Sequence, residues 1–195
     1  MACISHTSAR LSDGEDMLAR GVISRANRLA RKFGVQQGQA CIEAAHLLAN
    51  APPFAGNVPA GGEPQRHLLA ELDGIKVWGL DSSVLMNASD AGQIIVTGSH
   101  GGLVGGAGEP ARGIAIGAGI YHDAGICPDG SSTSRLPAFD KLGIPAVLVS
   151  AVSARISDAR SCYEDGVISM VNDRAAGGGA GPGMTAREFV ERAVS

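Results

Sequence analysis

The sequence predicts an α/β protein with a mainly parallel, Rossmann-like sheet in three layers and an N-terminal helical segment. From residue 75 onward, short apolar runs alternate with helix-like stretches, and most of these runs end in a glycine-rich or polar turn. Upstream, residues 16–50 carry apolar residues at helical spacing. We therefore expect a helical segment at residues 1–50 that packs on the main domain, a Pro/Gly loop at 51–64 and an α/β domain at 65–195.

The N-terminal segment is expected to hold two helices after a loose polar stretch. In Asp16 to Phe33, apolar residues recur at spacings of four and seven, and acidic residues precede basic ones, as the helix dipole favours. Gln37 to Asn50 carries a similar apolar face. Four prolines and three glycines between residues 51 and 64 indicate a loop, and Gln65–Leu72 is expected to add one or two helical turns.

The remaining elements follow from short apolar runs and their flanking turns. The predicted strands are Ile75–Leu80, Ile94–Gly98, a segment ending at Tyr121, and Ile144–Ser150. The predicted helices are Ser134–Leu142, Asp165–Asn172 and a last one through Val194, which opens with a capping box between Thr185 and Glu188. No internal repeat is expected.

Composition limits the classes of partner. The net charge of −3 gives no reason to expect nucleic acid or an anionic membrane surface, and no apolar run is long enough to span a membrane. The four cysteines form no CxxC pair, so we expect reduced thiols, and no signal-peptide core is visible at the N-terminus. A cytoplasmic protein is the resulting expectation. Small residues in the front helices would allow close approach of a second copy, so we also expect a homo-oligomer.

The predicted strands end in residue types common in catalytic sites. Because parallel strands place their carboxyl ends on one edge of a sheet, these side chains should converge there. The groups are Asp81 and Ser82 after the first strand, Ser99 and His100 after the second, His122 and Asp123 after the third, and Ser153 and Arg155 after the fourth. This convergence predicts a site.

One interpretation of this edge is acyl transfer. Ser99 would act as nucleophile and His122 as general base, with an aspartate orienting the imidazole. Backbone amides in the glycine turn would hold an oxyanion. The candidate catalytic residues are Ser99, His122, Asp123 and Asp158. The candidate substrate-binding residues are Thr97, His100, Gly101, Gly102, Ser153, Arg155 and Arg160.

Other interpretations stay open. A serine beside glycines is often only a turn residue. The glycine loops could bind a phosphate, although they match no standard nucleotide motif. The two arginines could bind a carboxylate or simply pair with nearby acids. A metal site would draw on His100, His122, Asp123 and Cys127, but their spacing fits no known signature, so neither a metal nor a cofactor is expected.

The sequence therefore predicts a small-molecule metabolic enzyme. The leading hypothesis is a hydrolase that cleaves an acyl or amide bond of a small, polar, anionic substrate. The alternatives are a lyase or isomerase using His/Asp acid–base chemistry, and a non-catalytic protein that binds a small ligand or nucleotide.

Overall fold

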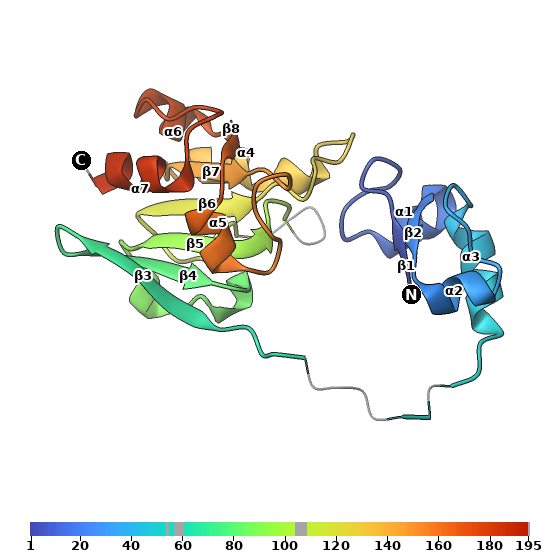
Figure 1. Ribbon diagram of the computed structural model, residues 1–195. Helices are drawn as coiled ribbons and strands as arrows, with labels where there is room; N and C mark the ends of the chain where they lie inside the picture. The colour runs from blue at the N-terminus through green and yellow to red at the C-terminus, as the bar shows by residue number, and fades with distance from the viewer. Residues whose placement is uncertain (54, 57–60, 104–108, 195) are drawn as a thin grey trace. The chain divides into compact units, whose positions relative to one another are not determined.

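The computed structural model describes residues 1–53, 55–56, 61–103 and 109–194. The chain divides into two compact units (Figure 1). Unit 1 comprises Met1–Gly62 with Ile126–Ser131, and unit 2 comprises Glu63–Gly125 with Ser132–Ser195. Each unit is considered by itself.

Unit 2 is an α/β unit built on one six-stranded mixed sheet. Its strands lie in chain order, β3-β4-β5-β6-β7-β8. The three central pairs, from β4 to β7, are parallel, and the two outer pairs are antiparallel. The strands are β3 (Arg66–Leu72), β4 (Ile75–Leu80), β5 (Ile94–His100), β6 (Ala118–His122), β7 (Ala146–Val149) and β8 (Ile168–Val171).

This topology confirms the α/β class and the parallel centre of the sheet. It contains no point where the strand order reverses, and such a reversal defines the doubly wound arrangement. The carboxyl ends of the parallel strands still share one edge.

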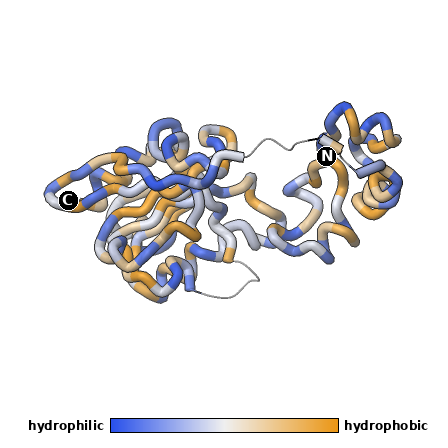
Figure 2. Tube along the Cα trace, turned by 90° about the horizontal axis from the view of Figure 1, so that it is seen from below, coloured by the Kyte–Doolittle hydropathy of each residue, from blue (hydrophilic) through white to orange (hydrophobic). Residues whose placement is uncertain are grey.

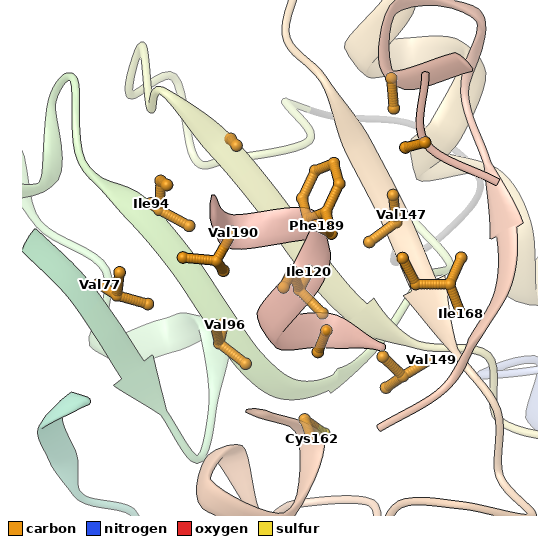
Figure 3. Close-up of a cluster of buried hydrophobic side chains, with 14 of the residues drawn as sticks. Val77, Ile94, Val96, Ile120, Val147, Val149, Cys162, Ile168, Phe189 and Val190 are labelled. Carbon is orange, nitrogen blue, oxygen red and sulfur yellow. The ribbon is translucent and has the colours of Figure 1, made fainter. Parts of the chain in front are cut away.

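Alternate residues of the central strands face two separate apolar clusters, as the two-residue period of a strand requires. On one face, Val96 of β5 and Ile120 of β6 pack with helix residues that include Phe189 and Val190, as Figure 3 shows. The opposite face carries a cluster that includes Tyr121 and Phe139. In Figure 2 orange stretches accordingly run through the middle of unit 2.

The described residues of unit 2 form the helices α4 (Arg135–Asp140), α5 (Ala159–Glu164), α6 (Asp173–Gly177) and α7 (Ala186–Val194). Short 3-10 turns at Ser83–Leu85 and Ala88–Asp90 connect β4 to β5. Two predictions for this unit are wrong. The stretch Gln65–Leu72, predicted as helical turns, contains the strand β3, which pairs with β4 in a hairpin. The expected helix at 165–172 contains the strand β8.

Unit 1 is a small α/β unit rather than a helical pair. Strand β1 (Ala2–Ile4) pairs with β2 (Ile23–Ala26), and the helices are α1 (Gly14–Arg20), α2 (Arg28–Lys32) and α3 (Cys41–Ala49). The predicted helix over residues 16–33 is therefore wrong, because a strand interrupts it. The second predicted helix is confirmed as α3.

Residues 1–50 and 146–195 form the same arrangement, with a constant offset of 145 in residue number. Aligned without a gap, the two segments share fifteen identical residues of fifty. Strand β1 corresponds to β7, β2 to β8, and the helices α1, α2 and α3 to α5, α6 and α7. The expectation of no internal repeat is therefore wrong. We call residues 1–50 the first copy and residues 146–195 the second copy.

The strand register repeats as closely as the element order. Ala2 lies opposite Ala26 as Val147 lies opposite Val171, and a register shift follows Cys3 just as one follows Leu148. An isolated antiparallel bridge also recurs, between Val22 and Ala40 in the first copy and between Val167 and Thr185 in the second.

Most identical residues have the same backbone role in both copies. The Asp13 and Asp158 side chains cap helices by accepting a backbone N–H at 2.9 Å, and Asn27 and Asn172 do the same at the next helix. Ser12 and Ser157 both adopt a left-handed backbone, with φ of 60° and 63°. These local contacts explain why two divergent segments keep one backbone.

No helix in the described part of the chain is long and apolar enough to cross a membrane.

Candidate functional site

The carboxyl edge of the sheet in unit 2 gathers many of the residues that the sequence singled out. Ser99 and His100 end β5, and His122 ends β6 opposite His100 in the parallel pairing. Asp123 follows directly, and its backbone N–H donates to the Val149 carbonyl at the end of β7. The predicted convergence of strand ends is present in the structure.

The loop that follows β7 folds back onto the end of β5. The backbone N–H of Ser157 donates to the Gly98 carbonyl at 2.8 Å. A Cβ atom at Gly98 would lie 2.5 Å from the backbone nitrogen of Asp158, so only glycine fits at this contact. The Gly98 backbone therefore positions the segment that carries Arg155 and Asp158 beside the strand ends.

Ser99 is held by backbone groups on the β4 side. Its hydroxyl oxygen accepts the backbone N–H of Ser83 at 2.8 Å, and its own N–H donates to the buried Thr97 hydroxyl oxygen at 3.0 Å. Within the described ranges, no hydrogen bond joins Ser99 to His122. The nucleophile–base pair thus stays a prediction, and the present contacts of Ser99 hold the backbone that follows β4 against the end of β5.

His122 is buried, with both ring nitrogens engaged by backbone groups. Its Nε2 lies 3.0 Å from the Ala154 carbonyl oxygen, which can only accept, so Nε2 carries the proton. Its Nδ1 accepts the N–H of Ala124 at 3.0 Å. This neutral imidazole ties the end of β6 to the loop after β7, and a role as general base would require it to give up one of these bonds.

The predicted aspartates and Ser153 also organise backbone. Asp123 accepts the N–H groups of Gly125 and Ala151 at 2.8 and 2.9 Å. Ser153 donates to a carbonyl at the start of its own loop and accepts the N–H of Val167 at 2.9 Å. Asp158 caps α5, and this backbone hydrogen bond, with help from Arg155, lowers the pKa of its carboxyl group. Neither aspartate contacts the His122 ring.

The two amides proposed for an oxyanion already donate within the fold. The N–H of Gly101 donates to the His122 carbonyl at 2.8 Å, and the N–H of Gly102 donates to Nδ1 of His100 at 3.1 Å. An oxyanion hole at these amides would therefore require the turn to rearrange.

His100 is held in one tautomer by that contact. Because Nδ1 accepts a hydrogen bond, the neutral ring carries its proton on Nε2. Burial, and secondarily the positive charge of Arg135, lower the pKa of His100. The side chain is thus neutral near neutral pH, with its proton on Nε2.

The arginines proposed to bind a carboxylate lie on the surface with partners. Arg155 is exposed and pairs with Asp158 at 3.0 Å, and a guanidinium nitrogen of Arg160 lies 3.3 Å from Nδ1 of His67. Exposed ion pairs of this kind contribute little to stability, so Arg155 can exchange its partner at small cost.

Arg135, which the sequence did not single out, is the buried cation at this edge. It is 7% exposed, its backbone N–H donates to the Gly101 carbonyl at 2.8 Å, and its guanidinium lies 4.9 Å from the centre of the Tyr121 ring. One guanidinium nitrogen donates to the Pro110 carbonyl, while Nε has no hydrogen-bond partner among the described residues. No signal in the sequence distinguished Arg135 from a surface arginine at a helix start.

No negative charge balances Arg135 in the described part of the chain. None of the ion pairs found there includes it. Burial raises the pKa of Tyr121 to about 12, so that phenol is neutral and provides no counter-charge. His100 is neutral as well. Burying an unpaired charge is costly, and here burial lowers the pKa of Arg135 itself.

The described ranges contain no cluster of three or more His, Cys, Asp or Glu side chains arranged to hold a metal ion. Comparison with known proteins adds no assignment: no family model, no curated protein and no solved structure matches this chain.

Proposed function

We propose that unit 2 is a small-molecule metabolic enzyme whose substrate carries an anionic group, and that Arg135 binds this group. The observation that carries the proposal is the buried guanidinium, whose Nε has no hydrogen-bond partner and which pairs with no carboxylate in the described ranges. A carboxylate or phosphate group is the complementary ligand, because the planar guanidinium fork matches either of them.

The neighbouring side chains suit a substrate of this kind. The pKa of His100 responds to the charge of Arg135. The backbone N–H of Arg135 and the ring of His100 also bond to neighbouring residues of the glycine turn, Gly101 and Gly102. Ser99 lies next to His100 on the same strand end and provides a hydroxyl donor. An anionic group on Arg135 would therefore place the adjoining part of the substrate near the neutral imidazole of His100.

The chemistry that these contacts favour is polarisation of a carbonyl, as in the lyase or isomerase alternative. A neutral imidazole N–H can stabilise developing negative charge on oxygen without being ionised itself. Acyl or amide hydrolysis with Ser99 as nucleophile remains the other candidate, and it requires His122 to release its backbone partners. The Ser99→Ala variant separates these two hypotheses. If Ser99 is the nucleophile, hydrolysis should stop; if Ser99 only anchors the substrate, its loss should chiefly weaken substrate binding.

Binding is tested with two arginine variants at the same edge. Thermal unfolding of the wild type, Arg135→Met and Arg155→Met is measured with inorganic phosphate, acetate and a panel of carboxylate and phosphate metabolites. Binding to the folded state raises the unfolding temperature. We expect this increase in the wild type and in Arg155→Met, and its loss in Arg135→Met. An equal response in all three proteins, or none in the wild type, contradicts the proposal.

A titration of His100 by NMR gives a second, independent readout. Its pKa should lie below the usual value of about 6.5. The Arg135→Met variant removes a positive charge and should raise this pKa, and a bound anion in the wild type should raise it too. An unchanged His100 titration in both cases would mean that Arg135 and His100 do not share a site.

A further inference from the structure

The first copy of the module has an open strand edge at a position that is filled in the second copy. In unit 2, β7 lies between β8 and β6, with β6 parallel to it. In unit 1, β1 corresponds to β7 and pairs only with β2 among the strands that the structure describes. The edge where β6 lies in unit 2 thus carries no strand in unit 1.

The backbone groups on this edge can be assigned from the second copy. In unit 2 the Val149 carbonyl accepts the N–H of Asp123 at 2.9 Å, so this carbonyl points toward β6. The corresponding residue of the first copy is Ile4, whose carbonyl therefore lies on the open edge. Unpaired strand edges of this kind are templates for an added strand.

Several side chains of the first copy are less buried than their counterparts in the second, as expected if a neighbouring strand is missing. All four residues of β7 are buried, whereas Ala2 and Ile4 of β1 are only partly buried and Cys3 is exposed. On the helices, Val190 is buried in the second copy, while its counterpart Ala45 is exposed. The positions left uncovered in unit 1 are those that the central strands cover in unit 2.

We propose that the β1 edge binds a short parallel β-strand of the β6 type, provided by a polypeptide segment other than β6 of this chain. The β6 strand itself is not available, because β5 and β7 occupy both of its edges. The second copy serves as the template for the contact: the register is that of β6 on β7, in which Tyr121 lies opposite Leu148. In the first copy, Cys3 takes the place of Leu148.

The template also specifies one side-chain contact. At the end of β6, Nε2 of His122 donates to the Ala154 carbonyl at 3.0 Å. The corresponding carbonyl in the first copy belongs to Ala9. A strand that ends in a histidine, or in another hydrogen-bond donor of similar reach, therefore fits this edge best. This inference does not depend on the anion site.

The test uses the full chain and a peptide with the sequence of Ile116–Asp123, in which cysteine replaces the residue at the Tyr121 position. In the predicted register this cysteine lies opposite Cys3, within reach of a disulfide. We expect an oxidised cross-link that mass spectrometry assigns to Cys3. Moving the cysteine to the Ile120 position places it on the other face of the strand and should lower the yield at least tenfold.

Methylated peptides test the backbone pairing without altering the protein. An N-methyl group at the Asp123 position blocks the bond to the Ile4 carbonyl and should abolish the cross-link. An N-methyl group at the His122 position should leave the cross-link intact. The backbone groups of His122 face β5 in unit 2, where the His122 carbonyl accepts the N–H of Gly101. Replacing this histidine by phenylalanine should weaken binding. Equal yields from all peptides, a cross-link at another cysteine, or a Cys3–Cys3 dimer that excludes the peptide would overturn the proposal.

Discussion

The two copies of the module share a backbone but differ in what surrounds it. In both copies the same polar contacts set the turns: an aspartate caps the first helix, an asparagine caps the second, and a serine in the left-handed region precedes the first cap. Phe189 of the second copy packs on the central sheet and is large. The corresponding residue of the first copy, where these strands are absent among the described residues, is the small Ala44. Local polar contacts therefore determine the backbone, whereas apolar side chains follow the surroundings.

The largest expected difference between the copies concerns the capping asparagines. Asn172 is buried, accepts the N–H groups of Ala146 and Ala175, and donates to the Ile144 carbonyl at 2.8 Å. Asn27 is exposed, caps its helix and accepts from the N-terminal amine. Asn172→Ala leaves buried groups unpaired and should reduce the free energy of unfolding of its unit by about 3 kcal/mol.

The counterpart variant Asn27→Ala removes mainly a cap, so it should cost about 1 kcal/mol. Hydrogen exchange of amides in each unit measures the two losses separately. Equal losses of unfolding free energy in the two variants would mean that the different surroundings of Asn27 and Asn172 have no effect. That result would contradict the difference proposed between the two copies.

A smaller effect of equal size in both copies is expected at two glycines. A Cβ atom at Gly21 would lie 2.2 Å from the Met17 carbonyl oxygen, and one at Gly166 would lie 2.1 Å from the Cys162 carbonyl oxygen. Because both contacts are with backbone, each Gly→Ala variant should cost roughly 2 kcal/mol. Gly14→Ala is the matched control, since nothing lies within 4 Å of its Cβ position and the second copy has Ala159 there.

Chemical denaturation of the two variants and the control measures these losses. If either Gly21→Ala or Gly166→Ala behaved like the control, the shared turn would not be present in that copy.

These copies also show what the sequence could and could not predict. The buried runs in β4, β5 and β6 were identified because they are apolar, β-branched and bounded by turns. The sequence predicts helices across the strands β2 and β8, because each strand is short and its apolar residues continue a helical spacing. Comparing the two Gly-Val-Ile-Ser stretches, each followed by a capping asparagine, would have corrected both errors.

The site was predicted in outline only. Strand order alone places Ser99, His100, His122 and Asp123 at one edge, so their convergence followed from the alternation of elements. The sequence does not reveal that both ring nitrogens of His122 bond to backbone groups, because one of these groups, the Ala154 carbonyl, comes from the loop after β7. Nor does it reveal that Arg135 is buried without an acid, since burial is a property of the assembled unit.

The smallest expected effect concerns the left-handed serines. Glycine adopts this backbone without strain but makes the unfolded chain more flexible, and the two effects nearly cancel. Ser12→Gly and Ser157→Gly should therefore each change the free energy of unfolding by less than about 1 kcal/mol, with the same sign. Thermal unfolding of both variants checks this, and a large loss in only one of them would show that the two turns are not equivalent.

The most direct test of the functional account is an NMR titration of the full chain with inorganic phosphate or acetate, followed at arginine Nε–H groups and backbone amides. We predict that the Arg135 Nε–H signal and the amides of Gly101 and Gly102 shift and saturate. The amides around Arg10, the counterpart of Arg155 in the first copy, should remain unchanged. Shifts of equal size around Arg10 and Arg135, or none at Arg135, would contradict the account.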